Sequence, residues 1–351
     1  MRMDDRKILD WAINKIQTDF KNDVALLIGH GFDKIEDDET GCLLRQFKGE
    51  FDYFIPESTR AYKLSKSFIV NGVGYDLYPR DWNSITSMAE LLDCHTGCLA
   101  DANVLYARSE EDRSRFEAMR KRLFHNLGDR RFVYRRAMDR FNMAMDIYQT
   151  MVFSEKESEV RMSAGFILDY LAQGVAFING SYFKRGPLYQ LEEMERFQKI
   201  PPSFREDYCA VLRGGTVVEL KKRCHHIIQH MGKFLDRQKP PAEARREPDF
   251  RGLADWYQEM GHTWKKIYSG CRMGDAPRVF FWGCSLQHEL DIIREEFGLR
   301  DMELLDAYDA DDLTRICERA QRLEKYITDT IVQNSVSIAI YPNVESFLAE
   351  N

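Results

Sequence analysis

The chain has 351 residues, which is long enough for two or three domains with cores of their own. An aromatic content of 12% favours a folded chain over a disordered one, and a net charge of −7 argues against a general nucleic-acid-binding protein. No apolar run reaches the roughly 18 residues of a membrane span, and acids interrupt the first residues where a signal peptide would be basic and then apolar. We therefore expect a cytoplasmic protein that binds neither nucleic acid nor membrane.

The first elements of the chain are a helix and a buried strand. Apolar residues recur at helical spacing over residues 4–20, and Val24–Ile28 is a short apolar run that is typical of a strand. The strand leads directly into Gly29, His30 and Gly31. Glycines after a strand let backbone N–H groups approach a phosphate, and they equally mark a plain turn. These three residues are candidates for nucleotide binding.

Two short apolar runs follow, and each carries acids where a core strand would not. Glu50 opens the run 51–56 and Asp52 interrupts it, while Asp76 interrupts the run 68–78. Residues two apart in a strand share a face, and a paired neighbouring strand lies about 5 Å away, so the three carboxylates could meet at one point. Such a cluster repels itself unless a cation neutralises it, and Mg²⁺ prefers oxygen ligands. The alternative is that these acids only end strands or face solvent.

The remaining pattern indicates a mixed sheet region followed by helices. Apolar residues at helical spacing from residue 130 onward predict a bundle of about five helices, interrupted by a glycine-rich turn in which Lys184 and Arg185 could bind a phosphate or simply be solvated. A segment rich in proline and charge then predicts a linker. We expect an α/β domain over 1–128, a helical bundle over 129–238 and a mostly helical region over 250–351. Within these domains the patterns predict helices over 58–67, 82–92, 109–127, 188–197, 250–272, 285–297, 310–333 and 344–349, and strands over 98–107 and 335–341.

Cysteine and histidine gather at two places in the sequence. Cys94 and Cys98 flank His95, and a later helical segment holds Cys224, His225, His226 and His230. Neither group has a second matching pair at the spacing of a structural zinc site. Packing within the protein is the simpler explanation for both, and zinc is the alternative.

The order of the motifs resembles the polymerase-β-type nucleotidyltransferase superfamily. The matching pieces are LLIGHG at the end of a strand, EFD within GEFDYFIP, and YDL within GYDLYP, followed by a helical bundle. The segment NVLYARSEED is similar to the strand and turn that often close the catalytic domain of that family. The resemblance extends over residues 1–235 and is strongest to small-molecule enzymes of the aminoglycoside-modifying type, which carry a C-terminal helical domain.

This resemblance implies a fold and an activity. The fold is α+β: a small mixed-sheet nucleotidyltransferase domain, a helical bundle and a mostly helical C-terminal extension. The activity is Mg²⁺-dependent transfer of a nucleoside monophosphate from a nucleoside triphosphate, ATP before others, to a hydroxyl of a small-molecule acceptor. It implies that Asp52 bridges the metal ions with Glu50 and Asp76 as flanking ligands, and that Asp76 also takes the acceptor proton. Gly29–Gly31 would hold phosphate oxygens, and a homodimer could complete the acceptor pocket.

The sequence departs from the family pattern in three ways. Histidine follows Gly29 where glycine or serine is usual, the loop before Glu50 is longer, and Glu50 stands where aspartate is commoner. The longer loop leaves Asp37 or Asp38 as an alternative first ligand. The departures also leave a second interpretation open, a catalytically degenerate nucleotidyltransferase-like protein with an interaction or regulatory role.

Overall fold

A five-stranded mixed sheet organises the N-terminal part of the computed structural model, which describes residues 3–31, 48–241 and 248–350. The strand order is β3-β4-β2-β1-β5, in which β2 and β4 are parallel and the other pairs are antiparallel. The strands are β1 Val24–Gly31, β2 Lys48–Pro56, β3 Lys66–Val70, β4 Val73–Pro79 and β5 Ala102–Ala107.

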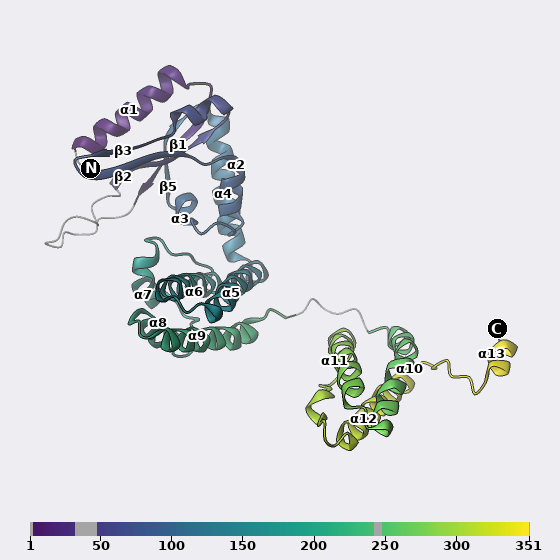
Figure 1. Ribbon diagram of the computed structural model, residues 1–351. Helices are drawn as coiled ribbons and strands as arrows, with labels where there is room; N and C mark the ends of the chain where they lie inside the picture. The colour runs from purple at the N-terminus through teal and green to yellow at the C-terminus, as the bar shows by residue number, and fades with distance from the viewer. Residues whose placement is uncertain (1–2, 32–47, 242–247, 351) are drawn as a thin grey trace. The chain divides into compact units, whose positions relative to one another are not determined.

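Helices cover both faces of this sheet (Figure 1). Helix α1 packs on one face, where its Ala12 and Ile16 meet Phe54 and Leu77 of the strands in one apolar cluster. The opposite face packs against α2, α3 and α4, with Tyr53 in a second cluster. Neighbouring residues of a strand thus enter different cores, as the alternation of side chains requires. The helices are α1 Met3–Asp19, α2 Trp82–Ala89, α3 Gly97–Ala100 and α4 Glu110–Gly128.

The second acid-bearing run is a hairpin and not the single strand that its apolar pattern predicts. Strands β3 and β4 pair antiparallel around Asn71 and Gly72, whose φ angles are 52° and 77°. An Asn-Gly pair between two apolar runs is the strongest short-range signal for a two-residue hairpin turn, because both residues must adopt positive φ. The Asn71-Gly72 dipeptide was therefore the sequence signal that predicts this turn.

Two further predictions in this region need correction. The segment predicted as a helix over 58–67 contains only a short 3-10 helix, η1 Thr59–Leu64, which Ser58 caps by accepting a hydrogen bond from the Arg60 N–H. The strand predicted over 98–107 starts four residues late, because α3 occupies Gly97–Ala100. In both cases a short turn of helix takes up residues that the apolar pattern alone assigns to a longer element.

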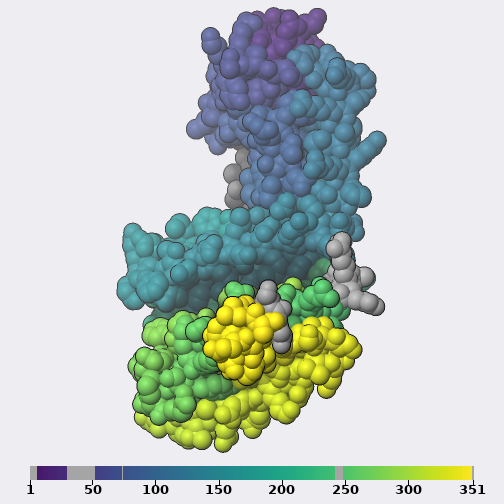
Figure 2. Space-filling view, turned by 90° about the vertical axis from the view of Figure 1, so that its right-hand side faces the viewer, coloured from purple at the N-terminus to yellow at the C-terminus, as the bar shows by residue number. Residues whose placement is uncertain are grey.

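A helical bundle follows directly on α4 and shares its core with the sheet. Asp129 accepts hydrogen bonds from the N–H groups of Arg131 and Phe132 and so starts α5 one residue after α4 ends. Helices α5, α6 and α9 pack on one another, and α8 packs on α9. Figure 2 shows the sheet region in purple and blue passing directly into the teal bundle. The bundle helices are α5 Arg130–Phe153, α6 Glu157–Ile178, α8 Phe204–Leu212 and α9 Val217–Gln238.

The helix predicted over 188–197 is broken into three short pieces. They are η2 Pro187–Tyr189, α7 Gln190–Glu193 and η3 Met194–Arg196. The buried carboxylate of Glu193 accepts hydrogen bonds from the backbone N–H groups of Lys184 and Arg185. This contact folds the preceding loop back onto the segment, so a local interaction replaces a regular helix.

The chain divides into two compact units, residues 1–241 and 242–351. The second unit is helical, as predicted, and has its own apolar core. Among the described residues of both units, no helix combines the length and the apolar character that crossing a membrane requires. The helices of the second unit are α10 Phe250–Met273, α11 Ala276–Phe297, α12 Thr314–Gln333 and α13 Val344–Glu350, with a 3-10 turn, η4 Leu305–Ala307.

The late strand predicted over 335–341 does not form. Val336 and Ile338 do pack against the helical core while Ser337 between them is exposed, so the side chains alternate as in a strand. A strand also needs a partner for its backbone groups, and the elements of this unit are helices. The Ala339 N–H instead donates to the side chain of Gln258, at 2.5 Å.

Gly270 of α10 lies close against Val279 of α11. A Cβ atom placed there would lie 2.7 Å from a methyl group of the buried Val279. We expect Gly270→Ala to lower the free energy of unfolding of the second unit by about 1–3 kcal/mol, because a buried β-branched side chain must shift. Gly261→Ala on the same helix is the matched control, since its Cβ would meet nothing within 4 Å. It should be stabilising, as alanine is the better helix former, and urea unfolding of both variants measures the difference. Equal effects of the two substitutions would contradict this packing.

Candidate functional site

A β-bulge turns Asp52 toward the face of the sheet that packs on α2–α4. Ile28 pairs with Tyr53 and the next residue, Gly29, pairs with Phe51, so Asp52 has no partner across the ladder. An extra residue of this kind interrupts the alternation of side chains. Asp52 accordingly lies on the same face as Tyr53: its Oδ1 accepts a hydrogen bond from the Tyr78 hydroxyl at 3.0 Å.

Asp76 lies on the neighbouring parallel strand and on the same face. Its neighbour Leu77 is buried in the α1 cluster, so Asp76 points the other way. The pairing of Tyr53 with Tyr78 sets the register and places Asp76 one position along from Asp52. Asp76 is exposed and accepts a hydrogen bond from Ser67 at 2.7 Å. Two predicted ligands therefore come to one face of adjacent strands.

The other predicted ligands of this site are less fully described. Glu50 lies in β2, two residues before Asp52, but its side chain is outside the described residues. Asp37 and Asp38, the alternative first ligands, lie outside the described residues as well. The pair Asp52 and Asp76 therefore defines the site.

The glycine segment continues β1 and does not form a turn. Gly29 pairs with Phe51 on one side and Asn103 on the other, and the ladder to β2 extends to Gly31. Pairing on both sides uses backbone groups that a turn would leave free. Gly29 is nevertheless placed beside the bulge, one register position from Asp52, and His30 pairs with Ala102 at the start of β5.

The turn before α7 brings one of its two predicted cations to this edge of the sheet. Lys184 Nζ lies 3.8 Å from Asp101 Oδ1, and Asp101 directly precedes Ala102. The hydroxyl of Tyr182 donates to both oxygens of the same carboxylate at 3.0 Å. Lys184 thus lies near the glycine end of β1.

Arg185 is held elsewhere. Its guanidinium pairs with Glu192 at 2.8 Å and with Glu193 at 3.3 Å, and it stacks over Tyr189. Both carboxylates belong to the segment that the sequence predicts as a regular helix. The structure therefore does not bring Arg185 to the carboxylates of β2 and β4.

A chain of polar contacts runs from Asp52 to the turn after α2, and we name it the Asp52 network. Tyr78, which donates to Asp52, accepts from Arg80 Nε at 3.3 Å, and Arg80 pairs with Asp93 at 3.2 Å. Asp93 in turn contacts His95 Nδ1 at 2.7 Å. Burial and the neighbouring Asp52 charge raise the pKa of Tyr78, so its hydroxyl stays a donor. The network is Asp52, Tyr78, Arg80, Asp93 and His95.

The ion pair of Asp93 and His95 predicts a dependence of stability on pH. The hydrogen bond to Asp93 and the contact with Cys94 raise the pKa of His95 to about 10. Burial alone would raise the pKa of Asp93, but the hydrogen bonds from His95 have the larger combined effect and lower it. The ion pair stabilises the folded state fully at pH values below about 6.5, which is the pKa of histidine in the unfolded chain. This contribution is lost as the pH rises through about 10, the pKa of His95 in the folded chain.

We therefore expect His95→Asn to lower the free energy of unfolding at pH 6 by less than about 1 kcal/mol, since His95 is half exposed, and to have no effect above pH 10. Urea unfolding of the variant and of wild type at several pH values measures the difference. His262→Asn, at an exposed histidine of α10, serves as the control. A deficit that stays constant with pH would contradict the ion pair.

Among the cysteines that the structure describes, only Cys94 lies in a group of side chains that could hold a metal ion, together with Asp93 and His95. Cys98 lies next to Asp52, where burial raises the pKa of its thiol, while Cys94 contacts His95 at 3.3 Å. In the later group Cys224 is buried in the bundle core, and His225 lies against Tyr148. All cysteines in the described part of the chain are free thiols.

Comparison with known proteins finds distant structural similarity and no matching family model. No family model matches the chain, and no curated protein matches it significantly. A solved structure of a nucleotidyltransferase-like protein from Exiguobacterium sibiricum 255-15 is similar to it with a TM-score of 0.36 and 11% sequence identity. The similarity covers 93% of this chain and 92% of that chain. At this TM-score the likeness carries no argument about the site, which rests on its geometry.

Sequence reasoning missed two charged residues of the bundle, the buried Arg140 and the partly buried Asp169. Arg140 of α5 donates to the carbonyl oxygens of Leu91 and Leu92 at 3.1 and 3.0 Å. Asp169 of α6 is held by the amides of two glutamines, and burial raises its pKa. An acid within the apolar run GFILDYLAQG was the signal, by the same logic that singles out Asp52 in its strand.

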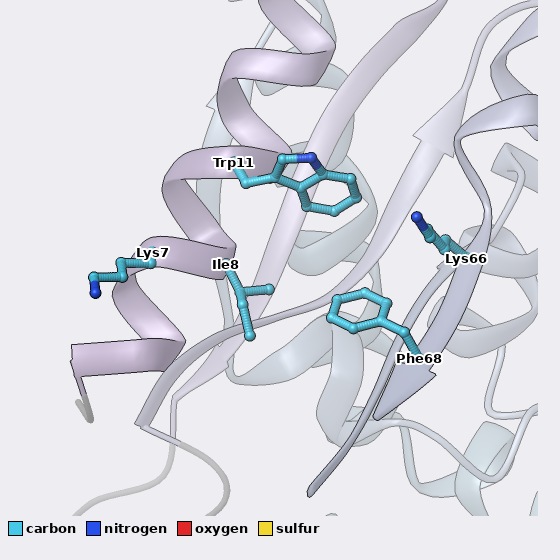
Figure 3. Close-up of a pocket in the computed structure, with 5 residues that line it drawn as sticks. All are labelled: Lys7, Ile8, Trp11, Lys66 and Phe68. Carbon is cyan, nitrogen blue, oxygen red and sulfur yellow. The ribbon is translucent and has the colours of Figure 1, made fainter. Parts of the chain in front are cut away.

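A shallow pocket lies on the opposite face of the sheet (Figure 3). Its volume is about 330 Å³, and α1 and β3 line it. The aromatic rings of Trp11 and Phe68 meet edge to face at 6.0 Å across it, and Lys66 lies 5.8 Å from the Trp11 ring. Because the sheet separates it from Asp52 and Asp76, this pocket is not part of the candidate site.

Proposed function

We propose that this protein is a nucleotidyltransferase that moves a nucleoside monophosphate from a nucleoside triphosphate to a hydroxyl of a small-molecule acceptor, in a Mg²⁺-dependent reaction. The observation that carries the proposal is the position of Asp52 and Asp76 on one face of adjacent parallel strands, beside Gly29. Two carboxylates on one face of adjacent strands offer oxygen ligands to a cation.

The donor set fits magnesium. Asp52 and Asp76 offer carboxylate oxygens, the ligands that a hard cation prefers. Neither side chain lies within ion-pair distance of a lysine or arginine among the described residues. Tyr78 donates to one oxygen of Asp52, and Ser67 donates to one oxygen of Asp76. Asp52 and Asp76 would hold the ion, with Glu50 as the third ligand that the family resemblance implies.

The residues then have distinct roles in the proposed reaction. Bound magnesium supplies neutralisation of the triphosphate charge and of the departing pyrophosphate. Asp76, the exposed acid, accepts the proton of the acceptor hydroxyl. The acceptor oxygen bonds to the α-phosphorus, and the bond from that phosphorus to the bridging oxygen of the β-phosphate breaks and releases pyrophosphate. The Lys184 ammonium would contact phosphate oxygens, whereas the backbone groups of Gly29–Gly31 are engaged in the sheet.

A second candidate function is an interaction protein with the same fold and no turnover. The observation that favours it is the cation already present in the Asp52 network: Arg80 lies 5.7 and 5.3 Å from the rings of Tyr53 and Tyr78 and bonds to the Tyr78 hydroxyl. Its charge offsets part of the Asp52 charge without any metal. A chain of this kind could keep its nucleotide site for regulation.

Thermal stability with ATP, measured with and without Mg²⁺ and followed by a pyrophosphate-release assay, tests the proposal. Free ligand at 100 times its Kd stabilises the folded state by about 2.7 kcal/mol, which gives a clear rise in melting temperature. We expect a rise that requires Mg²⁺, together with release of pyrophosphate. A rise without release supports the interaction protein, and no response to ATP or GTP with Mg²⁺ would end both candidates.

A further inference from the structure

Three metal-ligating side chains meet between α8 and α9, far along the chain from the carboxylates of the sheet. Asp207 lies on α8, and His226 and His230 lie one turn apart on α9, so that both rings project from the same face of that helix. We name these residues the α8–α9 cluster. One ligand atom from each lies within 4.8 Å of the others.

The distances within the cluster suit a small ion. Asp207 Oδ2 lies 2.8 Å from His230 Nδ1, and Asp207 Oδ1 lies 3.7 Å from His226 Nε2. The two imidazole rings are 4.1 Å apart between centroids. Ligands at about 2.0–2.2 Å from a tetrahedral ion lie about 3.3 Å from each other. One observed separation is shorter than this value and the other is longer. Small side-chain rotations that move the ligand atoms by a few tenths of an ångström would bring both to it.

Burial and charge also favour a cation at this place. The Asp207 side chain is 14% exposed and that of His230 is 27% exposed, while His226 is open to solvent at 55%. In the described part of the chain no lysine or arginine pairs with Asp207, whose charge is met only by the two histidines. A half-buried carboxylate without a cationic partner is a costly arrangement that a bound ion would relieve.

We propose that the α8–α9 cluster binds a divalent transition-metal ion, zinc in the first place. Two imidazoles and one carboxylate are a typical ligand set for zinc, and they disfavour magnesium, which takes oxygen ligands. Three protein ligands leave a fourth position on the exposed side of His226, which a water molecule fills. The ion would cross-link α8 to α9 and is chemically separate from the proposed magnesium site at Asp52 and Asp76.

The other cluster of possible ligands is the weaker candidate. Asp93, Cys94 and His95 are consecutive in sequence, so one short segment would have to supply all three ligands. Arg80 already pairs with Asp93 at 3.2 Å, so a metal ion would have to displace a buried cation. These residues also belong to, or adjoin, the Asp52 network.

The full chain, freed of metal with a chelator, tests this proposal by titration with ZnCl₂ followed by calorimetry and thermal unfolding. We expect one zinc ion per chain and a higher melting temperature. The variant His226→Ala/His230→Ala should weaken binding by at least about 100-fold, and Asp207→Asn should weaken it by a similar factor. His225→Ala is the matched control on the same helix, because that ring lies against Tyr148 and outside the cluster. It should bind zinc as wild type does.

Substitution with Co²⁺ gives an independent spectroscopic readout of the ligands. We expect visible absorption of a cobalt site with nitrogen and oxygen ligands, lost in the double histidine variant. Unchanged zinc affinity in His226→Ala/His230→Ala would overturn the proposal. So would a thiolate-to-cobalt charge-transfer band that disappears in Cys94→Ala, because it would place the ion at the other cluster. None of these measurements depends on nucleotidyl transfer.

Discussion

Asp52→Asn is expected to lower nucleotidyl transfer by about 10²- to 10³-fold or more without unfolding the protein. The amide has the shape of the carboxylate and can still accept the hydrogen bond of Tyr78 through one oxygen. It lacks the negative charge and the second oxygen that a magnesium ion requires. The rate of pyrophosphate release from ATP with Mg²⁺ measures the loss, and urea unfolding checks the fold.

The same substitution at Asp76 should give a comparable loss, because the two carboxylates share one proposed role. Asp10→Asn provides the control: Asp10 is an exposed acid on α1, which covers the opposite face of the sheet. That variant should transfer at the wild-type rate. If Asp52→Asn transfers as fast as the Asp10 control, the carboxylates of β2 and β4 are not the site, and the proposed function loses its basis.

The order of elements was predictable where one periodic pattern dominated a segment. Helices α4, α5 and α6 follow from apolar residues at helical spacing and from capping residues such as Ser109, which accepts from the Asp112 N–H as its S-x-x-D signature predicts. The α+β class with a helical C-terminal region is confirmed by the sheet and the helices that follow it. Local sequence preference and tertiary packing favour the same structure in these segments, so their secondary structure can be predicted from the sequence.

The late strand and the broken helix show where pattern reading fails. The pattern of Val336 and Ile338 is correct for side chains, but it carries no information about whether a neighbouring strand exists. The segment after Pro187 has a helical pattern, yet Glu193 binds backbone groups of the preceding loop and interrupts the helix. The first case depends on a neighbouring strand elsewhere in the chain, and the second depends on a contact with a loop. The apolar pattern of the segment itself contains neither.

The candidate site could be predicted in its residue types but not in its geometry. Asp52 was identifiable as an acid in an apolar strand, whereas the bulge that orients it depends on the pairing of Gly29 with Phe51. Arg185 looked equivalent to Lys184 in sequence, and only the structure shows that Glu192 and Glu193 hold it. Likewise Asp207 joins His226 and His230 through the packing of two helices.

Arg140→Met is expected to lower the free energy of unfolding of the first unit by about 2 kcal/mol. The guanidinium is 3% exposed and donates to the carbonyl oxygens of Leu91 and Leu92. Leu91 has a φ of 57°, an unfavourable conformation for a branched residue that surrounding contacts must hold. Methionine fills a similar volume but leaves both carbonyls without this donor.

Two opposing terms set the size of that effect. Burial lowers the pKa of Arg140, so removing its charge relieves a desolvation cost. The loss of two hydrogen bonds from a charged donor costs about 1.5–3 kcal/mol each, which outweighs that relief. Urea unfolding measures the net change, and Arg135→Met on the exposed side of the same helix should stay within about 0.5 kcal/mol of wild type. Equal stability of the two variants would show that Arg140 does not hold the turn.

The same variant tests whether the bundle positions the Asp52 network. Asp93 and His95 follow the turn that Arg140 holds, and their ion pair keeps the pKa of His95 near 10. If Arg140 fixes the turn, its loss moves Asp93 away from His95, and the His95 pKa falls toward the ordinary value of about 6.5. A titration of the His95 ring followed by NMR measures this shift. A His95 pKa that stays near 10 in a destabilised Arg140→Met protein would mean that Arg80 and Asp93 hold the network without help from the bundle.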